Sequence, residues 1–130
     1  MPTRSLRSCV LKWPDREEVL VAARDWARIE ASKHEGVLAV GCFGSYARGD
    51  WGVGSDLDLV AVVRTCEEAF ERRSQGWAIE DLPVPADVLI YTLDEWKRLS
   101  ETESRFARVL KEETEWLWSR GGGELSARRA

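Results

Sequence analysis

Residues 40–63 read VGCFGSYARGDWGVGSDLDLVAVV, and this stretch decides the fold and the chemistry of the chain. It opens inside a predicted strand over residues 37–43, which is short, apolar and bounded by glycines. The strand ends at Gly44, whose missing Cβ allows the backbone to approach a ligand closely. We expect Ser45 either to cap a short helix over residues 46–48 or to donate its hydroxyl to a phosphate. The first amides of such a helix form a site for an anion.

Two aspartates, Asp56 and Asp58, open the next apolar run, and ten residues separate the first of them from the serine. In a strand, side chains at i and i+2 point to the same face, so these two are expected side by side, roughly 6–7 Å apart. Two carboxylates at that separation repel by about 2–3 kcal/mol at an effective dielectric constant of about 20. Mg²⁺ offsets such repulsion, because it binds carboxylates and fills its other positions with phosphate oxygens and water. An acidic strand end exposed to solvent is the alternative, and the glycine-serine loop upstream disfavours it.

Gly44-Ser45, a spacer of ten residues and Asp56-Leu57-Asp58 resemble the signature of the nucleotidyltransferase superfamily related to DNA polymerase β. The extended segment GSYARGDWGVGSDLDL is similar in particular to the bacterial minimal nucleotidyltransferases. The resemblance implies that the glycine and the serine hold the triphosphate of ATP and that the two aspartates bind Mg²⁺. It also implies the reaction, in which a hydroxyl attacks the α-phosphate, pyrophosphate leaves, and two Mg²⁺ ions stabilise the attacking and leaving oxygens.

Two further residues, Arg48 and Ser55, complete the predicted nucleotide-binding set with Gly44 and Ser45. Ser55 directly precedes the first aspartate. Arg48 lies close enough to the loop in the sequence to help hold a phosphate. A surface arginine paired with Asp50 is the alternative for Arg48, and the sequence leaves both open.

The superfamily also uses a third carboxylate on a nearby strand, and Asp87 is the best candidate for it. Residues 88–91 read Val-Leu-Ile-Tyr, which predicts a strand with Asp87 near its start. If this strand neighbours the earlier one, the three carboxylates converge. The resemblance then implies that Asp87 completes the metal site or helps to deprotonate the incoming hydroxyl. A turn aspartate is the alternative for Asp87, and Asp81 in a loop is a weaker candidate. Asp94 is also weaker, because it fits the first turn of a helix capped by Thr92 with Glu95 at the capping-box position.

The remaining pattern predicts a mixed β-sheet flanked by helices, of the α/β or α+β class, in a single compact domain over residues 1–120. The resemblance implies the nucleotidyltransferase fold. A first helix is expected to begin with a capping box at Asp15 and to end at about Ser32. Trp116 and Trp118 would share one face of a last strand. The other predicted elements are strands over residues 8–13 and 115–119, helices over 66–74, 93–99 and 103–113, and a disordered glycine-rich tail at 121–130.

Length and composition restrict the class of protein. The 130 residues suit one domain, and 44% hydrophobic with 32% charged residues is ordinary for a soluble globular protein. The three cysteines are scattered without zinc spacing, so free thiols in a reducing cytoplasm are expected. We expect no signal peptide, and no apolar run reaches membrane-spanning length. The net charge of −4 disfavours a nucleic-acid partner held by phosphate contacts.

Three functions remain open at this point. The resemblance implies a site that is open on one side, closed either by a second copy of the chain in a homodimer or by a HEPN-type helical protein. In pairs of the latter kind the transferase is an antitoxin that adenylylates the toxin on a tyrosine, and this is the leading hypothesis. One alternative is nucleotidyl transfer to a small molecule such as an aminoglycoside. The other is a non-catalytic module that neutralises its partner by binding, which the presence of Asp56, Asp58 and Asp87 disfavours, because a degenerate site would tolerate their loss.

Overall fold

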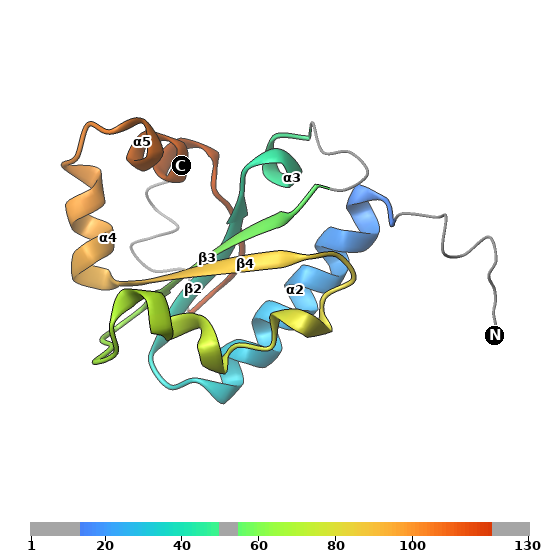
Figure 1. The fold of residues 1–130 in the computed structure, drawn as a ribbon, viewed down its shortest axis with the longest axis horizontal. Helices are drawn as coiled ribbons and strands as arrows, with labels where there is room; N and C mark the ends of the chain where they lie inside the picture. The colour runs from blue at the N-terminus through green and yellow to red at the C-terminus, as the bar shows by residue number, and fades with distance from the viewer. Residues whose placement is uncertain (1–13, 50–54, 121–130) are drawn as a thin grey trace.

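A mixed sheet of four strands lies at the centre of the structure (Figure 1). The structure is a computed structural model, and it describes residues 14–49 and 55–120. The strands are β2 (Val37–Phe43), β3 (Leu57–Val63), β4 (Ala86–Thr92) and β5 (Glu115–Ser119). Their order is β4-β3-β2-β5, in which β3 and β4 are parallel and the other neighbours are antiparallel. All four coincide with strands that the sequence predicts, so the mixed sheet is confirmed.

Helix α2 (Arg16–Lys33) covers one face of the sheet (Figure 1). Its N-cap is Asp15, and the predicted capping box with Glu18 is confirmed. The apolar side of the helix, which includes Leu20 and Trp26, packs with alternate side chains of β2 and β3 in one buried cluster. Full burial of such a side chain contributes about 1.5–3 kcal/mol, so this cluster holds the helix firmly on the sheet.

Helices α4 (Leu93–Ser100) and α5 (Arg105–Glu113) cover the opposite face, and both coincide with predicted helices. Ser104 caps α5, because its side chain accepts a hydrogen bond from the third residue of the helix. Trp96 of α4 and Leu110 of α5 are buried in a second cluster against the sheet. The sheet is therefore sandwiched between α2 and the α4–α5 pair.

The prediction of a helix over residues 66–74 is wrong. The chain forms a 3₁₀ helix there, η1 (Phe70–Gly76), followed by the short 3₁₀ helix η2 (Ile79–Asp81). No residue of η1 is buried. This charged segment has no apolar stripe to place against the core, so a regular α-helix would gain little from packing.

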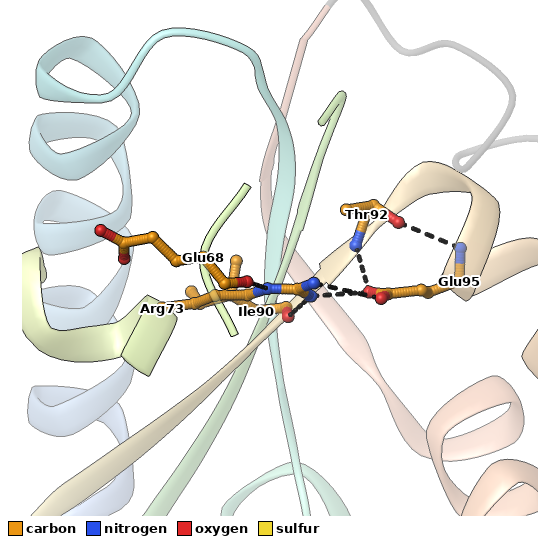
Figure 2. Close-up of polar contacts among 5 residues, drawn as sticks. All are labelled: Glu68, Arg73, Ile90, Thr92 and Glu95. Carbon is orange, nitrogen blue, oxygen red and sulfur yellow. Dashed lines mark hydrogen bonds and ion pairs between the residues drawn. The ribbon is translucent and has the colours of Figure 1, made fainter. Parts of the chain in front are cut away.

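Arg73 attaches η1 to the edge strand β4 and to the start of α4 (Figure 2). Its guanidinium donates to the backbone oxygens of Glu68 and Ile90, each at 3.0 Å. It also donates to both carboxylate oxygens of Glu95, at 2.7 and 3.2 Å. Glu95 in turn accepts from the backbone nitrogen of Thr92 and completes the predicted capping box of α4. These hydrogen bonds, those from Arg73 above all, lower the pKa of Glu95 to about 2.

The prediction that Trp116 and Trp118 share a strand face is also wrong. Trp118 lies opposite Val40 and Trp116 lies opposite Gly41. Because Val40 and Gly41 are consecutive, β5 has one extra residue, Leu117, between the two pairs. Such a bulge reverses the alternation of side chains. Trp118 therefore packs on the α2 side of the sheet and Trp116 on the α4–α5 side.

Some predictions concern residues outside the described ranges. They are the strand at 8–13, the tail at 121–130 with the domain boundary before it, and the pairing of Arg48 with Asp50. Among the described residues, no helix is both long enough and apolar enough to cross a membrane.

Candidate active site

Neighbouring strands bring two of the predicted carboxylates, Asp58 and Asp87, side by side at one end of the sheet. Phe43 lies opposite Asp58 in the β2–β3 pair, and Asp58 lies opposite Asp87 in the β3–β4 pair. Neighbouring strands are about 4.8 Å apart and register partners point to the same face, so these three side chains form one row. Phe43 belongs to the cluster beneath α4 and α5, which puts the row on that face. The structure thus places Asp87 beside Asp58, and their catalytic and metal-binding roles stay predictions.

Gly44 packs directly against this row. A Cβ atom on Gly44 would lie 2.5 Å from Oδ2 of Asp58, and the residue has φ of +81°. Gly44 is also the N-cap of the short helix α3 (Ser45–Arg48), with no side-chain capping bond. Ser45 is therefore the first helical residue, and the expectation that it caps this helix is wrong. The backbone turn at the cap needs a positive φ, which glycine adopts readily and serine does not.

Asp58 is the central carboxylate of the group in electrostatic terms. Burial raises its pKa above the ordinary value, and the charges of Asp56 and Asp87 raise it further. The charge of Arg48 opposes this shift. Asp56 and Asp87 are exposed, whereas Asp58 is partly buried. The three carboxylates therefore interact with one another, although they come from two strands and the loop before them.

The donor set fits a divalent cation in its chemistry. Burial and the charges of Asp56 and Asp87 disfavour the ionised form of Asp58, and a hard cation would offset both effects. Mg²⁺ takes carboxylate oxygens as ligands. Gly44, which has no side chain, lies directly against that carboxylate. Among the described residues, no three acidic, histidine or cysteine side chains converge as a preformed metal site.

Helix α3 is held from the α2 side by Arg16. The Nε atom of Arg16 donates to the backbone oxygen of Tyr46 at 2.7 Å, and its Nη2 atom pairs with Glu115 at 3.3 Å. Tyr46 itself is fully buried. The loop that carries Gly44 and Ser45 is thus fixed to both α2 and β5. The sequence contained no local signal for Arg16, because its contacts lie 30 and 99 residues away along the chain.

Arg48 is held from the α5 side by Glu113. The Nη1 atom of Arg48 lies 3.2 Å from Oε1 of Glu113, the last residue of α5. Sequence reasoning missed Glu113, which is 65 residues away from Arg48. Ser45 and Ser55 are partly buried next to the same loop, and their phosphate contacts stay predictions.

Cys42 lies directly behind the loop and is not a candidate nucleophile. Its side chain is fully buried in the α2-side cluster. Burial raises the pKa of the Cys42 thiol to about 12, so it stays protonated at neutral pH. This agrees with the expectation of a free cysteine inside a buried strand.

Comparison with known families gives one match that spans most of the chain. Residues 25–117 match the nucleotidyltransferase domain family. That range contains the loop, the aspartate pair and Asp87. No protein of curated function matches the chain in sequence.

Several solved structures share the fold. A candidate nucleotidyltransferase from Sulfolobus solfataricus aligns with a TM-score of 0.61 and 21% identity, over 92% of this chain and 94% of that chain. A toxin–antitoxin with AMP-PNP aligns with a TM-score of 0.52 and 15% identity, over 88% of this chain and 81% of that chain. A tyrosine-to-alanine mutant of the toxin–antitoxin MntA-HpeT gives 0.50 and 15%, over 88% and 80%. At these identities the likeness shows the fold, and the family match along residues 25–117 shows that this chain belongs to the nucleotidyltransferase domain family.

Proposed function

We propose that the chain transfers AMP from ATP to a hydroxyl group, that this hydroxyl belongs to a tyrosine of a HEPN-type helical toxin, and that the transfer makes the chain an antitoxin. The observation that carries the proposal is the register that sets Asp58 against Asp87, with Gly44 packed on Asp58. Membership of the nucleotidyltransferase family supports the reaction class. The toxin–antitoxin with AMP-PNP, which has the same fold, supports ATP as the donor and a toxin as the partner.

Each site residue has a role in this reaction. Gly44 and Ser45 receive the triphosphate, since Gly44 has no side chain and the backbone amides at the start of α3 can bind an anion. Arg48 and Ser55 add a positive charge and a hydroxyl beside it. Asp56, Asp58 and Asp87 would hold Mg²⁺, which when bound stabilises negative charge on the reacting phosphate oxygens. These roles agree with the general rule that enzymes catalyse phosphate transfer mainly by positioning the reacting groups and neutralising their charge.

The bond changes follow from this arrangement. The tyrosine oxygen forms a bond to the α-phosphorus, and the bond from that phosphorus to the oxygen bridging to the β-phosphate breaks. Pyrophosphate leaves with that oxygen. Asp87 lies at the outer end of the row on the edge strand, which suits a group that takes the proton from an incoming hydroxyl. Because Asp87 pairs with Asp58 in the register, it lies one strand spacing from that central carboxylate.

The test is transfer of label from ATP radiolabelled at the α-phosphate to a purified HEPN-type partner. We expect the wild type to label the partner on tyrosine, and Asp58→Asn and Asp87→Asn to reduce the rate by about 10³-fold or more. Asp81→Asn and Asp94→Asn are matched controls, since they remove the two weaker candidates for the third carboxylate and should retain the rate. Full labelling by Asp58→Asn would contradict the assignment. If the chain bound the partner tightly but did not label it, the function would be neutralisation by binding, and not nucleotidyl transfer.

A further inference from the structure

Phe106, in the first turn of α5, is a large apolar side chain that remains in contact with solvent. It is 46% exposed, whereas Ala107 and Leu110 of the same helix are fully buried. Removal of an aromatic ring from water is favourable, so a ring exposed to this extent can still gain from a further contact. Single exposed apolar residues are common on protein surfaces, and the position of this one decides what it can contact.

The ring of Phe106 lies directly beside the row of side chains that forms the site. Phe43, which pairs with Asp58 in the register and ends the row, meets Phe106 in an edge-to-face contact. The ring centroids are 6.0 Å apart and the planes are inclined at 80°. Figure 1 shows α5 and α3 at the same end of the sheet. One side chain therefore connects the exposed ring to the central carboxylate.

Helix α5 holds Phe106 in a fixed place. At its start, the backbone nitrogen of Ala107 donates to Oγ of Ser104 at 3.1 Å. Ala107 and Leu110 anchor the middle of the helix by burial, and at its end the hydroxyl of Thr114 donates to the backbone oxygen of Leu110. A ring carried by such a fixed helix binds a ligand with little additional loss of conformational entropy.

The row has two different ends, and Phe106 lies at the end next to the triphosphate loop. Gly44 and Ser45, which hold the triphosphate in the proposed function, follow Phe43 directly in the chain. Asp87, which takes the proton of the acceptor hydroxyl in that proposal, lies at the opposite end on β4. The position of the ring thus favours a contact with the nucleotide over one with the acceptor. The flat base of a nucleotide is a ligand that stacks well on an aromatic side chain.

We propose that Phe106 stacks on the adenine base of ATP and thereby increases the affinity of the site for the nucleotide. The inference rests on the proposed function, since it takes Gly44 and Ser45 to hold the triphosphate. The ribose separates the base from the α-phosphate, so the base lies away from the carboxylates, as the ring does. Every base has a flat face, so the contact favours a nucleoside triphosphate over triphosphate alone. Stacking is equal before and during transfer, so it lowers KM and leaves kcat unchanged.

The test is calorimetric titration of ATP and of inorganic tripolyphosphate, each with Mg²⁺, into the full chain alone and with its partner. We expect Phe106→Ala to weaken the binding of ATP about five- to fiftyfold. Tripolyphosphate has no base, so its affinity should change less than about twofold. Phe106→Tyr retains the ring and should bind ATP within about threefold of the wild type. With the partner present, KM for ATP should rise in Phe106→Ala by the factor seen in the titration, at unchanged kcat.

Phe70→Ala is the matched control. Phe70 is a second exposed phenylalanine, at 39%, but it packs on Tyr91 and not on the row of the site. Its loss should change the affinity for ATP less than about twofold.

The two ligands separate the inference from the function on which it rests. Equal weakening of ATP and tripolyphosphate by Phe106→Ala overturns the inference, because the loss then does not depend on the base. Unchanged binding of ATP by this variant overturns it as well, and slower labelling of the partner in that case would assign the ring to the partner protein. No binding of ATP by the wild type, alone or with its partner, overturns the proposed function itself.

Discussion

The Oδ2 atom of Asp58 lies 2.5 Å from the point that a Cβ atom on Gly44 would occupy. The glycine of the loop and the central carboxylate are therefore in direct contact, and any larger residue at position 44 displaces one of them. Gly44→Ala should reduce transfer by about 10²-fold, because a shift of about 1 Å at the reacting groups costs that much. It should also destabilise the fold by about 1–3 kcal/mol, because alanine is strained at φ of +81°. Transfer rates and urea unfolding measure the two effects.

Gly49→Ala is the control for this substitution. Gly49 has φ of +90°, but a Cβ there would meet no atom of residues 14–49 and 55–120 within 4 Å. The variant therefore suffers the backbone strain without the collision with Asp58. It should lose a similar amount of stability and keep transfer within about tenfold of the wild type. If both variants lost transfer equally, the loss would come from backbone strain, and the contact with Asp58 would not be its cause.

Asp58→Asn should stabilise the protein while it abolishes transfer. Burial and the charges of Asp56 and Asp87 raise the pKa of Asp58, so its ionised form is disfavoured in the folded state. Asparagine has the same shape without the charge, so the substitution removes the free-energy cost of the ionised group in the folded state. Substitutions at functional sites often stabilise a protein at the cost of its activity in this way. We expect a melting temperature about 2–5 °C higher at neutral pH and low salt, measured calorimetrically without Mg²⁺. A lower melting temperature would show that Asp58 has a structural role.

The local part of this site is readable from the sequence. The strand before Gly44, the strand after Asp58 and the strand after Asp87 all have the short apolar pattern that predicts them, and all are present. The capping boxes at Asp15 and Thr92 are equally local and are confirmed. These features depend on residues within a few positions of one another, which is the range over which sequence patterns are informative.

The non-local part was not predictable in the same way. The contacts of Arg48 with Glu113 and of Arg16 with Tyr46 depend on how α5 and α2 dock on the sheet. The bulge at Leu117 depends on the fit of β5 against β2, and it reversed the face of one tryptophan. Pattern reasoning assumes a regular strand, and one inserted residue is enough to defeat it. The phosphate and metal contacts of the site residues remain predictions.

Gly41→Ala should be strongly destabilising, although Gly41 has no unusual φ. A Cβ there would lie 2.7 Å from Cγ2 of Thr114 and 2.9 Å from Cε3 of Trp116. Thr114 directly precedes β5 and Trp116 lies in it, so β5 would have to move away from β2. We expect a loss of about 1–3 kcal/mol in urea unfolding, as for overpacking in other cores. Gly76→Ala is the control, since its Cβ would make only an ordinary contact at 3.6 Å with His34 and should cost less than about 1 kcal/mol.

Glu95→Gln should destabilise the protein at neutral pH and not in acid. The side chain of Arg73 is 8% exposed and binds both oxygens of Glu95, and these hydrogen bonds lower the pKa of Glu95 from 4.5 to about 2. A carboxylate with a lowered pKa stabilises the folded state above its ordinary pKa, and this contribution is lost as the pH falls from 4.5 towards 2. Because Glu95 is 30% exposed, we expect a loss of only about 1–2 kcal/mol at neutral pH.

Glutamine suits this experiment because it still serves in the capping box with Thr92, so the charge is the main change. Urea unfolding of the wild type and of Glu95→Gln between neutral pH and about pH 3 should show the difference shrinking through the acid range. Asp94→Asn, an exposed acid in the same helical turn, should give a smaller difference at neutral pH. A difference for Glu95→Gln that is constant with pH would mean that packing around Arg73, and not the ion pair, holds η1 on the edge of the sheet.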